Sequence, residues 1–152
     1  MGKSHFVECD KELSALPVVS SDRELLKLCD AAGLAYLEGF NKFYLTAKET
    51  MNKRLCEILE KKQNFVYDRT NMTSEGRMRI LQRLKKAGYE VRCLNFGVPV
   101  TQTEKDLVAQ RCKERLRQVI PEEVFESMCA HFVQPTMTEG FDQIIQIRMR
   151  NL

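Results

Sequence analysis

The sequence predicts an α/β fold, a three-layer α/β/α arrangement in which helices cover both faces of a parallel sheet of about four strands. Short runs of β-branched and aromatic residues alternate with longer segments of helical periodicity along the whole chain, and this alternation is typical of parallel strands joined by helical crossovers. The chain has 152 residues, a length at which one domain can bury a sizeable core. We therefore expect residues 1–152 to form a single domain.

The first sixty residues are expected to hold one strand among helices. The short apolar run at 17–20 is typical of a strand. Ser21 and Glu24 have the spacing of a capping box, in which the serine bonds forward and the glutamate reaches back. Gly33 is a natural place for the helix that starts there to end. The helices expected in this part of the chain cover about 5–15, 21–33 and 43–62.

The remaining ninety residues continue the alternation. Thr73 or Ser74 can cap a helix whose apolar positions fall on one face, and Gly88 stands where a left-handed helix end is expected. Pro121, followed by two acids, is typical of a helix start. The expected strands cover 64–67, 89–96 and 143–147, and the expected helices cover 74–87, 103–117 and the segment after Pro121.

The composition excludes several classes of protein. The net charge of +3 is too small to imply a nucleic-acid partner by itself. Six cysteines contain no C-x-x-C pair and only two histidines are present, which argues against a zinc site and a disulfide framework and favours free thiols in a reducing, cytoplasmic compartment. No apolar run reaches membrane-spanning length and no signal peptide is visible, so no membrane association is expected.

The chain is organised around the stretch 64–77, where polar residues follow a buried strand. Phe65–Tyr67 are aromatic or β-branched, Asp68 ends the run, and Thr70 and Asn71 follow in a turn before a helix. Ligands bind at this carboxyl end of the strands in open α/β sheets. The other interpretation is an ordinary strand, turn and helix with solvated polar groups.

Two further groups could take part in chemistry near strand ends. Asp22 lies just past the strand at 17–20 and is a candidate general base, although it could equally be a helix-capping acid. Gly2, Lys3 and Ser4 match the end of the phosphate-binding pattern G-x-x-x-x-G-K-[ST]. The triplet alone is a weak signal because such triplets are common.

The segment 111–117 carries four cations among seven residues, R-C-K-E-R-L-R. It is either a solvated basic helix face or a set of cations that cover the charge of a triphosphate. In the second case, charge and positioning would do most of the catalytic work.

The order of these motifs resembles a known family. The chain reads G-K-S, V-V-S-S-D, F-V-Y-D-R-T-N, G-Y-E-V-R-C-L-N-F-G-V-P, a basic helix, V-I-P-E-E-V-F-E-S-M and P-T-M-T-E-G-F-D-Q-I-I-Q-I. This order is similar to that of the polynucleotide-kinase type of P-loop kinase, which phosphorylates 5′-hydroxyl ends. The resemblance covers residues 2–147 and implies a P-loop kinase-like fold with ATP and Mg²⁺ as cofactors.

The resemblance implies roles on the nucleotide side of the site. Gly2 and Lys3 would contact the phosphates of ATP, and Ser4 would bind the magnesium ion. Arg111 and Arg115 match the two arginines of the family's lid. One of them, Arg111, would lie near the nucleotide base, and Arg115 would contact the transferred phosphoryl group as a catalytic residue.

On the substrate side, Asp22 matches the family's acid that takes the proton from the attacking 5′-hydroxyl. Asp68, with Thr70 and Asn71, matches the D-x-T-N element beside the substrate, and Asp68 also lies next to the metal. The family often places an arginine three residues after the catalytic acid. This chain has leucine there, and Arg23 is the nearby cation for the substrate backbone.

The sequence departs from the family at its start. No apolar strand and no G-x-x-x-x precede Gly2, so the usual first strand and most of the loop that binds phosphate are lacking. The neighbouring strands would then pair directly, capture a protein partner or a second copy, or leave an open seam. The chain is either a fragment, or a gene model begun at an internal methionine, or a complete protein that has lost ATP binding.

Three functions follow from these observations. The first is an ATP-dependent kinase that acts on the 5′-hydroxyl end of a nucleic acid. The second is a non-catalytic module on a kinase scaffold that binds nucleic acid or protein, and the third is a kinase of a small molecule.

Overall fold

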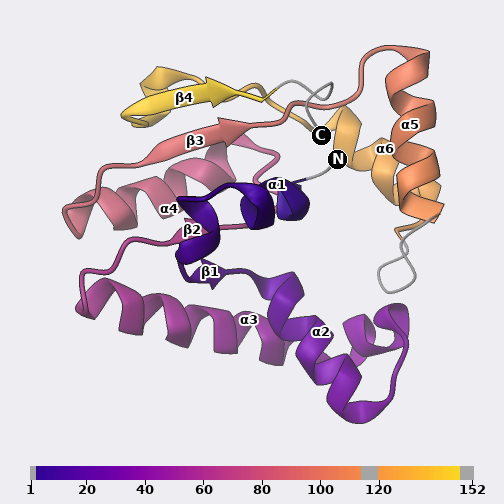
Figure 1. Ribbon diagram of the computed structural model, residues 1–152, viewed down its shortest axis with the longest axis horizontal. Coiled ribbons are helices and arrows are strands. Elements are labelled where there is room, and N and C mark those ends of the chain that lie inside the picture. Colours follow the sequence, from indigo (N-terminus) through magenta and orange to yellow (C-terminus); the bar gives the residue numbers. More distant parts are fainter. Residues whose placement is uncertain (1–2, 114–119, 148–152) are drawn as a thin grey trace. The chain divides into compact units, whose positions relative to one another are not determined.

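The computed structural model describes residues 3–113 and 120–147 (Figure 1). From Ser4 onward, the described residues form two compact units: one holds Ser4–Arg69, and the other holds 70–113 and 120–147. The single domain expected from the sequence stays a prediction.

The first unit pairs two short parallel strands and packs two helices against each other. Val18 lies opposite Val66 and Val19 opposite Tyr67, so both strands end at the same edge. Its elements are α1 (Lys3–Cys9), a 3₁₀ turn η1 (Leu13–Ala15), β1 (Val18–Val19), α2 (Ser21–Ala32), α3 (Tyr36–Glu60) and β2 (Val66–Tyr67).

The start of α2 differs from the expected capping box. The N-cap is Ser20, whose extended backbone (φ −149°, ψ 126°) lets its hydroxyl accept from the Arg23 N–H at 3.4 Å. Ser21 is already the first helical residue, so its side chain does not cap the helix. Glu24 turns to Lys27 and Arg54 instead of reaching back. The expected helix end is confirmed: Gly33 has φ +64°, the left-handed conformation that glycine adopts without strain.

Helix α3 begins seven residues earlier than the expected start at 43. The Glu38 carboxylate accepts from the Ala35 N–H at 3.3 Å and so satisfies one of the helix's free N-terminal donors. Gly39 lies against α2 so closely that an added Cβ would be 2.1 Å from the Cys29 sulfur. This close approach lets Leu25, Cys29 and Ala47 form the buried cluster between the two helices.

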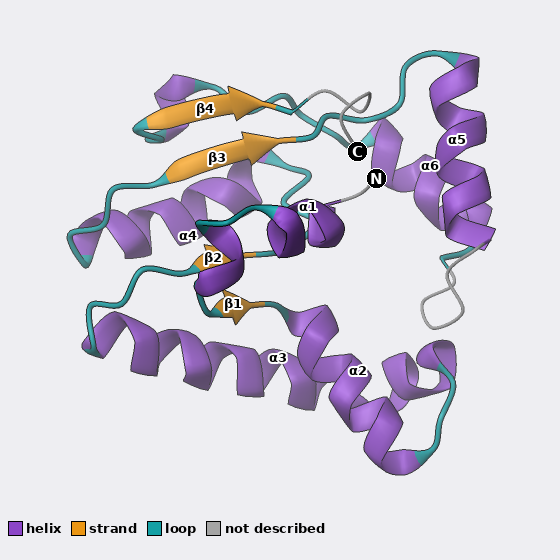
Figure 2. Ribbon diagram, in the orientation of Figure 1, coloured by secondary structure: helices purple, strands orange, loops and turns teal. Residues whose placement is uncertain are grey.

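The second unit also contains one parallel strand pair, shown in Figure 2. Arg92 lies opposite Gln143 and Asn95 opposite Gln146. Its elements are α4 (Ser74–Lys86), β3 (Arg92–Asn95), α5 (Gln102–Lys113), α6 (Glu122–Ala130), a 3₁₀ turn η2 (Met137–Glu139) and β4 (Gln143–Gln146).

Helix α4 confirms the sequence interpretation most closely. The Thr73 hydroxyl accepts from the Gly76 N–H at 3.2 Å, and Gly88 has φ +83° just past the helix end. The side that faces inward carries Leu81, Leu84 and, unexpectedly for an apolar stripe, Arg77. The part of the expected basic helix beyond residue 113 lies outside the described residues.

The chain is a mixed α/β protein with parallel strands, as expected, but the described strands form two separate pairs. The single four-stranded sheet and its three layers stay a prediction. Within the described ranges, none of the helices combines the length and the apolar character needed to cross a bilayer. The five cysteines whose side chains are described are free thiols.

Candidate functional site

The carboxyl ends of β1 and β2 place two acids at one edge of the first unit. Asp68 directly follows β2, and its backbone N–H donates to the Val19 carbonyl at 3.0 Å. Asp22 comes three residues after Val19, in the first turn of α2. Both residues are partly exposed. Because the strands run in the same direction, the acids lie at the edge where parallel sheets bind ligands.

A hydroxyl from a distant part of the chain joins this edge. The Ser4 Oγ donates to Oδ2 of Asp68 at 3.5 Å, across 64 positions of sequence. Ser4 belongs to α1, next to Lys3 at the head of that helix. The two residues that the resemblance implies for magnesium are therefore neighbours in space.

Arg23 has a partner in the same unit. Its Nη2 donates to the Glu8 carboxylate at 3.4 Å, and both side chains keep substantial exposure, 38% and 63%. An exposed pair of this kind contributes little to stability. Arg23, at the start of α2, therefore contacts Glu8 of α1. Its contact with a substrate stays a prediction.

Arg69 was not identified from the sequence. Burial lowers the pKa of its guanidinium, but the contacts with Tyr67 and Tyr44 outweigh this effect and raise the pKa above its ordinary value. Arg69 is therefore a permanent cation directly after Asp68.

Thr70 and Asn71 lie in the second unit, on the loop that precedes α4. Thr70 is exposed. Asn71 has φ +46°, a left-handed conformation that is uncommon for residues other than glycine, although asparagine tolerates it better than most. The carbonyls of Asn71 and Met72 both accept from Nη1 of Arg77, at 2.9 and 3.2 Å.

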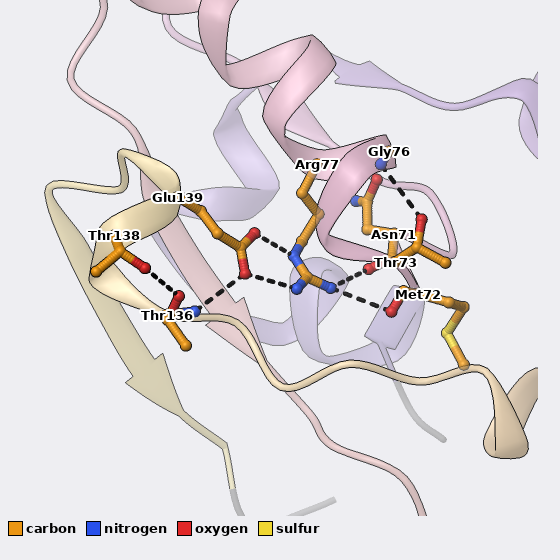
Figure 3. A network of polar contacts seen from close by, with 8 residues as sticks. All are labelled: Asn71, Met72, Thr73, Gly76, Arg77, Thr136, Thr138 and Glu139. Carbon is orange, nitrogen blue, oxygen red and sulfur yellow. Dashed lines mark hydrogen bonds and ion pairs between the residues drawn. The ribbon is translucent and has the colours of Figure 1, made fainter.

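The guanidinium of Arg77 is the centre of a buried polar network (Figure 3). Its Nε and Nη2 donate to the two carboxylate oxygens of Glu139, each at 2.7 Å, and only 3% and 4% of the two side chains is exposed. The hydrogen bonds from Arg77 lower the pKa of Glu139 below its ordinary value, although burial acts in the opposite direction. Hydrogen bonds from the Thr136 N–H and from Ser74 lower the pKa further. Burial raises the pKa of the nearby Cys93 thiol.

The remaining predicted residues belong to the nucleotide side. Lys3 is the first residue of α1, and the backbone of Arg111 lies in α5. Gly2 and Arg115 lie outside the described residues. Their contacts with a nucleotide stay predictions.

The residues at the first unit's edge fit a magnesium ion by donor type. A hydroxyl and a carboxylate 3.5 Å apart are the hard oxygen ligands that Mg²⁺ prefers. The described residues contain no group of three or more His, Cys, Asp or Glu side chains that could hold a metal. Because Mg²⁺ commonly keeps waters and takes phosphate oxygens besides one or two protein ligands, a pair of donors is sufficient.

Comparison with known proteins identifies the family. A family model described as an AAA domain matches residues 1–135. The chain belongs to this family. The AAA domain match and the similarity to a curated relative confirm the resemblance to polynucleotide-kinase type P-loop proteins. They support a kinase-like nucleotide-binding domain.

A curated relative is the bifunctional polynucleotide phosphatase/kinase of Schizosaccharomyces pombe, 26% identical over 115 residues. The match covers 76% of this chain and 28% of the relative. The chain therefore spans about a quarter of the length of that protein.

Sequence reasoning missed Arg77 and Glu139 as members of the AAA domain's polar interior. A signal was present: Arg77 shares the buried face of α4 with Leu81 and Leu84, at intervals of four and three residues. A charged residue on an apolar stripe needs a buried partner. Nothing in the spacing of the sequence points to Glu139, 62 residues later, as that partner.

Proposed function

We propose that this AAA domain takes part in phosphoryl transfer from ATP to the 5′-hydroxyl of a nucleic acid. The observation that carries the proposal is the common edge of β1 and β2, where Asp22 and Asp68 follow neighbouring parallel strands and the Ser4 hydroxyl contacts Asp68. The name of the fission-yeast relative supports a nucleic-acid substrate.

In this proposal Asp22 is the general base. Its carboxylate accepts the proton of the 5′-hydroxyl as that oxygen forms its bond to phosphorus, and ADP leaves. Asp22 is partly exposed, so an incoming hydroxyl can reach it. Thr70 and Asn71 hold the substrate end, and Arg23 contacts its backbone.

The nucleotide side consists of a cationic set and two oxygen donors. Ser4 and Asp68 hold Mg²⁺, while Gly2, Lys3 and Arg111 bind ATP and Arg115 contacts the transferred group. When bound, ATP supplies the phosphoryl group and Mg²⁺ neutralises phosphate charge. The cations stabilise the charge that spreads over the equatorial oxygens.

A protein partner and a cytoplasmic location are part of the same proposal. We infer that the outer edges of the strand pairs can take a protein partner or a second copy. Free thiols suit a cytoplasmic location.

A 5′-end labelling assay tests the proposal. The full 152-residue chain is incubated with radiolabelled ATP, Mg²⁺ and a 5′-hydroxyl oligonucleotide, beside the variant D22N. The matched control is D30N, at the exposed far end of the same helix. We expect transfer that falls by about 10²–10⁴-fold in D22N and is unchanged in D30N.

Two other results would replace the proposal. Oligonucleotide binding without any transfer above the D22N level would make the domain a non-catalytic binding module. Transfer to free nucleosides in preference to oligonucleotides would make it a small-molecule kinase.

A further inference from the structure

The buried pair of Arg77 and Glu139 lies next to the segment that carries Thr70 and Asn71. In total, four hydrogen bonds leave the Arg77 guanidinium: two go to Glu139 and two to the carbonyls of Asn71 and Met72 (Figure 3). A guanidinium has five N–H groups, so nearly its whole donor capacity is used. The arginine therefore joins one fixed carboxylate to two consecutive carbonyls of the loop.

The carboxylate side of this link is itself held in place. Oε1 of Glu139 also accepts from the Thr136 N–H at 3.2 Å, and the Glu139 N–H donates to the Thr136 carbonyl at 3.1 Å. This closes the turn η2 around the glutamate. Glu139 is consequently held by hydrogen bonds within its own backbone turn.

The backbone of the loop at Asn71 adopts a conformation that neighbouring contacts must stabilise. Asn71 is held at φ +46°, and a residue in a sparsely populated backbone region persists only when its surroundings impose it. The Met72 carbonyl also accepts from the Val133 N–H at 2.8 Å. These contacts use the carbonyls of Asn71 and Met72, while Thr70 stays exposed.

Stability alone does not explain the pair. Well-packed apolar residues often match or exceed the stability of a buried ion pair, because desolvation offsets most of the attraction. A fork of donors aimed at two carbonyls, however, fixes geometry in a way that apolar contact does not.

We propose that Arg77 is a positioning residue, anchored by Glu139, that holds residues 70–72 in the conformation that receives the 5′ end of a nucleic acid. The inference rests on the proposed function, in which Thr70 and Asn71 contact the substrate. It adds that substrate affinity depends on a buried residue that touches no substrate.

The test replaces the ion pair by apolar residues of similar size, in the variant R77M/E139L of the full chain. The matched control is R79M/E75L, which removes an exposed pair from the same helix, with side chains 76% and 74% exposed. Urea denaturation checks that both variants fold. Backbone ¹⁵N relaxation and oligonucleotide fluorescence anisotropy are then measured on each.

In the native chain and the control we expect order parameters near 0.85 at Asn71 and Met72, and in R77M/E139L values below about 0.6. If about a tenth of the molecules keep the competent loop, the dissociation constant for a 5′-hydroxyl oligonucleotide rises about tenfold. Affinity for ATP stays within about twofold, which a general loss of structure would not allow.

Unchanged order parameters in R77M/E139L overturn the inference, whatever the affinity does. A mobile loop with unchanged oligonucleotide affinity overturns the link to substrate. If the native chain binds no oligonucleotide, the proposed function and that link both fail, while the relaxation data still decide whether the pair holds the loop. Should R77M/E139L not fold, R77K serves instead, because lysine keeps the charge but cannot bridge the carboxylate and both carbonyls.

Discussion

The helices of the two units are held to their neighbours by different kinds of contact. In the first, α2 and α3 meet through Leu25, Cys29 and Ala47, with a glycine allowing close approach; the pair is drawn at the lower part of Figure 1. In the second, α4 is tied to its loop and to η2 by the Arg77–Glu139 pair. Apolar attraction is not directional, whereas a buried charge must keep its partner.

Glutamates in the two units show the same difference. The Glu24 side chain is 9% exposed, but its partners Lys27 and Arg54 are 62% and 39% exposed. The Glu139 side chain and its partner Arg77 are both almost completely buried. Removal of one member should therefore cost little in the first unit and much in the second.

The largest expected effect comes from E139A. Loss of the carboxylate leaves the Arg77 guanidinium buried without its charge partner, so the free energy of unfolding should fall by about 3–5 kcal/mol. Urea denaturation followed by circular dichroism measures it. A loss below 1 kcal/mol would mean that the guanidinium finds water or another acceptor.

The corresponding break in the first unit is G39A. A Cβ at this position would lie 2.1 Å from the Cys29 sulfur, so the Cys29 side chain must rotate or the two helices must move apart, at a cost of about 1–3 kcal/mol. The control is the same substitution in a C29A background, where the sulfur is absent. There the alanine should be neutral or stabilising, because alanine favours helix over glycine. Equal losses in both backgrounds would contradict the steric explanation.

Acid should weaken the second unit through Glu139. Its folded pKa lies below its ordinary value, so the contribution to stability is complete above the unfolded pKa of about 4.3 and is lost as the pH falls through the folded pKa. Thermal unfolding between pH 7 and 2.5 should show a drop in Tm below about pH 4.3, and E139Q should flatten part of it. An identical acid profile in E139Q would refute the assignment.

The smallest effect is expected for E24Q. Lys27 and Arg54 can turn to water when the charge is removed, so stability should change by less than about 1 kcal/mol and the change should shrink in 0.5 M salt. The same urea titration measures it. A loss as large as that of E139A would erase the contrast between the two units.

Local chemistry explains which parts of the structure the sequence predicts well. Helix α4 was predicted almost to the residue, because Thr73 and Gly88 mark its ends and its apolar residues repeat with helical spacing. The N-cap of α2 is Ser20 and not the predicted Ser21, since two consecutive serines can both cap and only the backbone angle of Ser20 decides between them. The early start of α3 places Gly39 against Cys29, a contact between two helices that no local pattern reveals.

The features of the candidate site also differ in whether neighbouring residues are enough to predict them. The sequence alone predicts the alternating α/β pattern, the acids after two strands and the resemblance of the motif order to polynucleotide-kinase type P-loop kinases. These are properties of neighbouring residues, so periodicity and turn chemistry suffice to find them.

Only the tertiary structure decided that Ser4 contacts Asp68 and that Glu139 is the partner of Arg77. Each contact joins residues more than 60 positions apart. Hydrogen bonds of this kind depend on distances of a few ångströms, which are set by how strands pair and helices pack rather than by any residue's near neighbours.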